Sequence, residues 1–148
     1  MNEVFDIAAT SRNSATFMIV VSAVITLLTI GIFGYIGMTM NHMFIAAGPD
    51  SIKVRIPMYT KTIKRSDIYA DQVRVIDMNA PGSPRLGMRT NGIGLPGFQG
   101  GWFRLSGGGK VLAAITDRSK VVVIPTRLGY DIMASVKNPE ALIASLKR

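Results

Sequence analysis

The chain of 148 residues has no cysteine, one histidine and only nine acidic residues, and each shortage excludes a class of site. Without cysteine there is no disulfide framework, no cysteine-ligated metal and no thiol nucleophile. His42 alone cannot form a multi-histidine metal site, and the chain has no second histidine for a Ser-His-Asp triad. The aspartates are scattered, and no pair of them predicts an acid/base couple. We therefore expect a non-enzymatic protein without a cofactor.

Charged residues are also missing from the whole stretch between Asn13 and Pro49. Within it, the apolar-rich segment 17–38 makes a helix of roughly 33 Å, enough to cross the hydrocarbon core of a bilayer. A cleaved signal peptide, the alternative, would have a basic start and a shorter apolar core, whereas this chain starts with Glu3 and Asp6. The predicted organisation is an N-terminal tail over 1–14, a transmembrane helix over 15–41, a linker over 42–50 and a soluble domain over 51–148.

The charges beside the helix predict its direction in the membrane. Lys53 and Arg55 follow it, while Arg12 alone precedes it. Positive charge is retained in the cytoplasm, so we predict that the N-terminus lies outside and the soluble domain inside. The position of Arg12, close to the helix, argues for the opposite direction.

Three small residues recur in the second half of the helix at Gly31, Gly34 and Gly37. Three steps of about 100° nearly complete a turn, so these glycines form a slowly drifting stripe. Such a stripe lets a partner helix or a second copy approach closely. The alternative is that glycine is simply common in membrane helices.

Positive charge is concentrated in residues 51–148, which hold 16 Lys or Arg against 6 Asp or Glu, a balance of +10. This balance favours an anionic partner, such as phospholipid or an acidic protein face, although it could also be a solubilising charge near a membrane. Nucleic acid is a poor fit, because aromatic residues are not interleaved with basic ones. We expect a membrane-protein partner or self-association, with anionic phospholipid as a further partner.

Short strand patterns fill the same segment. Ile52, Val54 and Ile56 alternate with Lys53 and Arg55, which is typical of a half-buried strand. A C-terminal helix should follow an Asn-Pro-Glu start, because asparagine caps a helix N-terminus well and proline suits its first position. A long, irregular, glycine-rich loop is predicted over 79–101, with room for a brief strand around Met88–Arg89. About seven antiparallel strands are predicted, at 51–57, 59–64, 72–78, 102–105, 111–116, 121–125 and 130–136.

Four runs in this segment, at 89–97, 100–103, 114–117 and 138–143, resemble the bacterial pleckstrin-homology (PH)-like domains. The resemblance implies a mainly β fold: a seven-stranded antiparallel barrel or sandwich capped by a C-terminal α-helix. It implies little about activity, because this fold is a platform for proteins, peptides and lipids. We expect a membrane-tethered interaction module that acts as a scaffold or accessory subunit, or alternatively a domain that binds or senses anionic phospholipid headgroups.

Basic residues on the first two predicted strands form one candidate contact site for anionic lipid or an acidic partner. Each Lys or Arg close to an anionic leaflet contributes about 1 kcal/mol of binding free energy by general electrostatic attraction. Specific recognition of a lipid headgroup is the alternative to this general attraction. The group comprises Lys53, Arg55, Lys61, Lys64 and Arg65.

Aromatic residues around the glycine-rich loop form a second candidate site, composed of Phe98, Trp102 and Phe103. Because neighbours on a strand alternate, one of Trp102 and Phe103 should face the core. The other, with Phe98, could form an apolar patch for a partner. Alternatively, all three pack under the loop.

Overall fold

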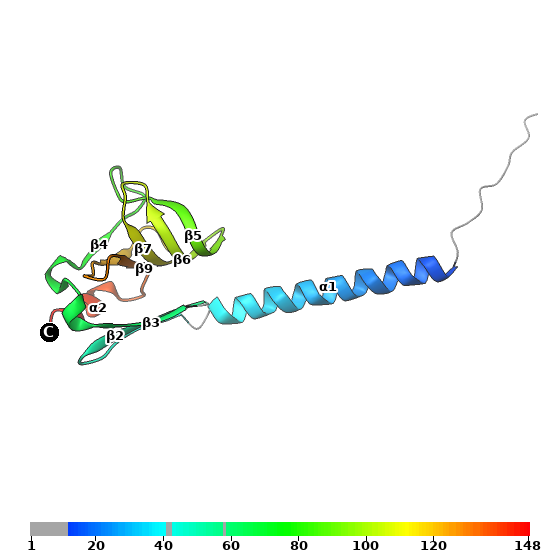
Figure 1. The fold of residues 1–148 in the computed structure, drawn as a ribbon, viewed down its shortest axis with the longest axis horizontal. Coiled ribbons are helices and arrows are strands. Elements are labelled where there is room, and N and C mark those ends of the chain that lie inside the picture. The colour runs from blue at the N-terminus through cyan, green and yellow to red at the C-terminus, as the bar shows by residue number, and fades with distance from the viewer. Residues whose placement is uncertain (1–11, 41–42, 58) are drawn as a thin grey trace, which may run out of the picture. The chain divides into compact units, whose positions relative to one another are not determined.

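The computed structural model describes residues 12–40, 43–57 and 59–148, and the chain divides into two compact units, Met1–Thr39 and Met40–Arg148 (Figure 1). Helix α1 (Arg12–Met40) makes up the described part of the first unit. Its segment Asn13–Met38 is long and apolar enough to cross a membrane, and none of its most apolar window is buried within the chain. The predicted N-terminal apolar helix is therefore present, and it begins three residues before the predicted start at 15.

The apolar side chains of α1 are exposed on all sides, as Phe17 at 69%, Leu28 at 61% and Phe33 at 65% illustrate. An apolar surface of this kind needs lipid or a partner around it. The polar groups within the helix are satisfied locally, since the hydroxyl of Thr26 donates to the Ser22 carbonyl at 2.9 Å. These features suit a hydrocarbon environment, where every polar group must find a partner within the protein.

The second unit contains nine strands in two sheets among its described residues (Figure 1). The three-stranded sheet is antiparallel and has the order β1 (Phe44–Ala47), β2 (Ser51–Ile56), β3 (Tyr59–Lys64). The six-stranded sheet has the order β4-β8-β9-β7-β6-β5, and its only parallel pair is β7 with β9. Its strands are β4 (Arg74–Ile76), β5 (Leu86–Leu95), β6 (Phe98–Leu105), β7 (Lys110–Ile115), β8 (Val121–Ile124) and β9 (Asp131–Ala134).

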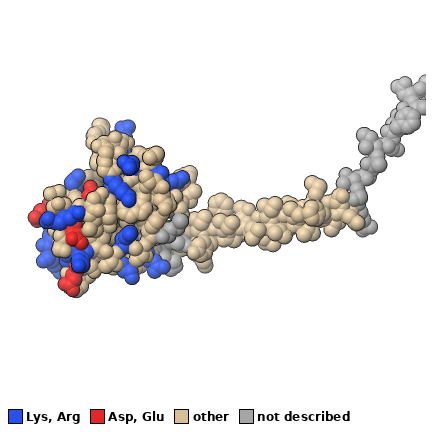
Figure 2. Space-filling view, in the orientation of Figure 1, with Lys and Arg blue, Asp and Glu red and all other residues tan. Residues whose placement is uncertain are grey.

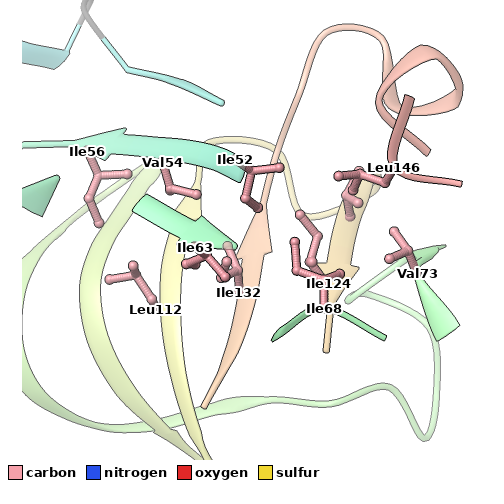
Figure 3. Close-up of a cluster of buried hydrophobic side chains, with 11 residues drawn as sticks. Ile52, Val54, Ile56, Ile63, Ile68, Val73, Leu112, Ile124, Ile132 and Leu146 are labelled. Carbon is pink, nitrogen blue, oxygen red and sulfur yellow. The ribbon is translucent and has the colours of Figure 1, made fainter. Parts of the chain in front are cut away.

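The hydrophobic core has two parts, one on each face of the six-stranded sheet. The first part joins residues of β2 and β3, such as Ile52 and Ile63, to Leu112 and Ile132 of the six-stranded sheet (Figure 3). The second part lies on the opposite face and includes Phe103, Val111, Val121 and Met133 among its members. Because successive side chains on a strand alternate, β7, β8 and β9 contribute to both parts. This explains the unbroken apolar run Val121–Ile124, which is buried throughout.

Helix α2 (Pro139–Leu146) closes one side of the first core. Its start is capped as expected: the Asn138 side chain accepts a hydrogen bond from the Ala141 N–H at 3.3 Å. Leu146 is buried in the core, and Leu142 packs against it. Two short 3-10 helices, η1 (Arg65–Asp67) and η2 (Ala70–Gln72), connect the two sheets.

Three sequence-based expectations are corrected by the fold. There are nine strands rather than seven, because β1 lies in the predicted linker 42–50 and β5 lies in the predicted loop 79–101. The strands are not all antiparallel, since β7 and β9 run parallel. From Leu86 onward the predicted loop is instead part of a hairpin of β5 and β6, which turns at Pro96 and Gly97 with a Gly97 φ of 78°. Proline followed by a glycine at positive φ is typical of a type II turn.

Candidate functional site

Three basic residues lie on one outward face of the three-stranded sheet. Lys53 and Arg55 are exposed, whereas their neighbours Ile52, Val54 and Ile56 point into the core. Lys64 of β3 pairs with Ser51 of β2. Residues opposite each other on antiparallel strands share a face, so Lys64 joins Lys53 and Arg55 on the outer side. We call these three residues the basic face, and Figure 2 shows how widely Lys and Arg are spread over the domain.

The other two predicted contact residues lie elsewhere. Lys61 pairs with Val54, which places it on the core side of β3, yet it is exposed because β3 is an edge strand. Arg65 is half-buried and bonded to backbone carbonyls. The five basic residues predicted as one contact group are therefore divided between two faces of the sheet and one internal position. Sequence spacing alone does not reveal this, because the register of β3 against β2 decides which face each residue takes.

Arg65 connects two segments that are far apart in the sequence. Its Nε donates to the Gly48 carbonyl at 2.9 Å, just after β1, and one terminal nitrogen donates to the Ser145 carbonyl at 2.8 Å. The same nitrogen lies 3.4 Å from the Leu146 carbonyl. The last carbonyls of a helix have no partner within the helix, so Arg65 supplies donors to the end of α2. Its geometry is that of a structural residue.

Two of the three aromatic residues predicted as a partner patch are buried. Phe98 is 2% exposed and Phe103 is 4% exposed, the latter within the second core. Trp102 is half-buried and meets the ring of Tyr130 edge-on, with centroids 4.9 Å apart. The Lys110 ammonium lies 4.3 Å from the centre of the Trp102 ring. The two phenylalanines are unavailable to a partner because their side chains are buried.

A cavity of about 430 Å³ lies between the first half of β1, the end of β2 and the ends of β7 and β9. We call it the β1 groove. Its charged lining residues are both basic, Arg55 and Lys137, and no lining residue is Asp or Glu. The remaining lining is apolar or weakly polar: Met43, Phe44, Ile45, Val54, Ile56, Ala114, Thr116, Ala134, Ser135 and Val136. A cavity of this size suits a small ligand or one or two side chains of a partner.

The β1 groove has almost no signature in the sequence. Its lining comes from four strands that are distant in the chain, and β1 itself was expected to be linker. The apolar tetrapeptide Phe44–Ala47 was the one available hint, because an apolar run after a membrane helix is also compatible with a strand.

The three glycines of α1 lie on an open helix surface. A Cβ atom added at Gly31, Gly34 or Gly37 would have no atom within 4 Å, apart from the helix's own backbone. The space above them is available for another helix. Their role in helix packing stays a prediction.

Among the residues that the structure describes, the pKa values of Asp117 and Tyr130 are shifted. The Ser119 hydroxyl and N–H donate to Asp117 Oδ1 at 2.7 and 2.8 Å, which holds the pKa of Asp117 below its ordinary value. Burial raises the pKa of Tyr130, and the charge of Asp67 raises it further. The described residues include no group of three or more His, Asp or Glu placed to hold a metal ion.

Comparison with known proteins agrees with this fold. The family model described as "Bacterial PH domain" matches residues 43–148, which include all nine strands and α2. No curated protein and no solved structure matches the chain. The match covers well over half of the chain and ends at its last residue. The mainly β second unit is a PH-like domain, and the chain belongs to the bacterial PH domain family.

Proposed function

We propose that this protein is a non-enzymatic, membrane-tethered interaction module that acts as a scaffold or accessory subunit of a membrane protein complex. Its basic face binds an acidic surface of the partner. The observation that carries this proposal is the outward cluster of Lys53, Arg55 and Lys64 on a sheet whose three strands contain no acidic residue. PH-like domains are in general non-catalytic platforms, which supports a binding role.

The basic face is suited to orienting a partner more than to holding it tightly. Lys53 and Arg55 lie two residues apart on β2, roughly 7 Å along the strand. Individually, exposed ion pairs contribute about 0–1 kcal/mol. Several like charges on one face instead steer association and select a partner of opposite sign. The affinity must come largely from other contacts.

A short connection to the predicted membrane helix keeps the domain close to membrane proteins. β1 begins at Phe44, four residues after the end of α1 at Met40. Four residues of extended chain span at most about 14 Å. A domain on so short a connection meets a membrane-embedded partner at a high effective concentration, so weak contacts are sufficient.

We place the domain on the cytoplasmic side, with the N-terminus outside, because Lys53 and Arg55 follow the helix. The absence of cysteine allows a clean test with the single variant Lys120→Cys, which lies in an exposed turn. A membrane-impermeant maleimide should label it in inverted membrane vesicles and leave it unlabelled in intact spheroplasts. Labelling in intact spheroplasts would reverse the orientation.

Anionic phospholipid is the second candidate ligand, and the same basic face favours it. Each Lys or Arg close to an anionic leaflet gains about 1 kcal/mol, and the three members of the basic face are exposed. The domain's balance of +10 adds a long-range attraction to such a surface.

Charge reversal of the basic face tests the proposed function. The full chain carrying Lys53→Glu, Arg55→Glu and Lys64→Glu is purified from membranes in mild detergent. Its matched control reverses three exposed basic residues elsewhere in the domain: Arg85, Arg104 and Lys120.

We expect the native chain and the control to retain a stoichiometric membrane-protein partner that the basic-face variant loses. If the native chain instead carries anionic lipid and no protein, the second candidate is supported. Equal retention of the partner by both variants would contradict a role for the basic face.

A further inference from the structure

The four edges of the two sheets are protected unequally. Unpaired strand edges invite other strands, and proteins block them with charges, bulges or very short strands. The edge strand β3 carries Lys61 on its core side, which is one such device. β4 has only three residues, and β5 contains register shifts against β6. β1 is also short, with four residues, but its sequence Phe-Ile-Ala-Ala carries no charge and it pairs with β2 without a shift.

This uncharged edge strand lies directly beside the β1 groove. Met43, Phe44 and Ile45 line the groove, so the first half of β1 borders open space. The other end of β1 is held in place, since Arg65 binds the Gly48 carbonyl and links it to α2. The chain just after β1 is therefore anchored by a hydrogen bond, while the first half of β1 borders the groove.

We propose that β1 is a strand-addition site for an extended segment of the protein partner. The segment pairs with the free edge of β1 and places an apolar side chain in the β1 groove, with an acidic residue beside Arg55 and Lys137. This inference rests on the proposed function and specifies the chemistry of the partner. Main-chain hydrogen bonds supply affinity in this mode of recognition, and the pocket beside the strand supplies specificity.

Charge and hydrogen bonding favour a peptide segment of the partner over a second copy of the domain and over a lipid acyl chain. A second copy of the domain would bring a further balance of +10 to a groove whose charged residues are both basic. An acyl chain could fill the apolar part of the groove, but it has no donors or acceptors for the strand edge. A peptide that alternates apolar and acidic residues satisfies the edge, the apolar lining and the two cations together.

The test uses the full chain in nanodiscs of zwitterionic phosphatidylcholine and a labelled probe peptide of alternating valine and glutamate. A second peptide with lysine in place of glutamate is the charge control. We expect the glutamate peptide to bind at least about tenfold more tightly, a difference of about 1.4 kcal/mol. It should also slow amide hydrogen exchange within residues 44–47, which side-chain contact alone would not do.

Two matched substitutions locate the binding. Thr116 is exposed and lines the groove, so Thr116→Trp should fill it and weaken binding of the glutamate peptide at least about tenfold. Thr62 is exposed on the outer face of β3, and Thr62→Trp should leave the affinity unchanged. Lys137→Glu should also weaken binding of the glutamate peptide and so reduce the difference in affinity between the glutamate and lysine peptides.

The inference is overturned if the glutamate peptide does not bind, if it binds without slowing exchange in β1, or if both tryptophan variants behave alike. Displacement of the peptide by phosphatidylglycerol would assign the groove to lipid. A disulfide between two Ala46→Cys chains would assign the edge to a second copy. If Thr116→Trp keeps the protein partner and the basic-face variant loses it, strand addition at β1 is refuted and the proposed function stands. Retention by the basic-face variant would refute the proposed function.

Discussion

Replacement of Arg65 by methionine separates a structural role from a surface role for this residue. Methionine keeps an unbranched stem of similar length but removes every donor. The change leaves the Gly48 and Ser145 carbonyls without the bonds of 2.9 and 2.8 Å that Arg65 supplies. The third contact, at 3.4 Å to Leu146, is too long to contribute much.

The expected loss follows from these two bonds. A hydrogen bond to a charged group contributes about 1.5–3 kcal/mol. Arg65 is half-buried, so the lower end applies, and the free energy of unfolding should fall by about 3 kcal/mol. For a domain of about 100 residues, this lowers the Tm by more than about 10 °C. The stability of Arg65→Lys should fall between that of the native chain and that of Arg65→Met, because lysine lacks the forked guanidinium that reaches both carbonyls.

Urea unfolding of the full chain in detergent micelles measures this loss. Trp102 is the only tryptophan, and its half-buried ring against Tyr130 makes its fluorescence a probe of the domain. Lys64→Met is the matched control, since Lys64 is exposed and next in sequence. If the two variants unfold at the same urea concentration, Arg65 does not hold α2 to the end of β1 and the reasoning fails.

Three further outcomes are expected. Gly101→Ala should lower the free energy of unfolding by about 3 kcal/mol or more in the same assay. The φ of Gly101 is 126°, which disfavours a side chain, and a Cβ there would collide with the backbone of β5. The control Gly107→Ala should be nearly neutral, because a Cβ at Gly107 meets nothing within 4 Å. Asn138→Ala should cost about 1 kcal/mol through loss of the α2 cap, and an unchanged midpoint would argue against the cap. Burial is the larger cause of the raised pKa of Tyr130, so Asp67→Asn should lower that pKa only partly in a spectroscopic titration. Because the pKa of Tyr130 is higher in the folded state, neutral Tyr130 contributes to stability at any pH below its ordinary pKa near 10, and this contribution is lost as the pH rises through the folded-state pKa. If Asp67→Asn returned the pKa of Tyr130 fully to its ordinary value, burial would be refuted as the main cause.

Local patterns in the sequence determined several elements correctly. The uncharged run between Asn13 and Pro49 predicts the apolar helix, because length and hydropathy are properties of a contiguous segment. The alternation in Ser51–Ile56 predicts β2 and its buried face. The start of α2 follows from Asn138, whose cap needs only residues three positions away. Each of these signals is contained within one contiguous segment of the chain.

Elements that depend on distant partners were decided by the tertiary structure. β5 is rich in glycine, which disfavours a strand by itself, and it exists because β6 pairs with it along most of its length. Gly92 and Gly101 face each other across this pair, where a Cβ on either would collide with the other strand's backbone. The parallel pairing of β7 with β9 is likewise a matter of topology, which no local periodicity encodes.

In the candidate site, too, some features follow from the sequence and others only from the tertiary structure. Composition alone determined that the domain is basic and that it follows an apolar helix. Only the register of β3 against β2 places Lys53, Arg55 and Lys64 on one face while sending Lys61 to the other, because a shift of one residue reverses every side chain. Only the packing of α2 gives Arg65 its internal role. The β1 groove, assembled from four strands, has no local sequence signature, because its walls meet only when the two sheets come together.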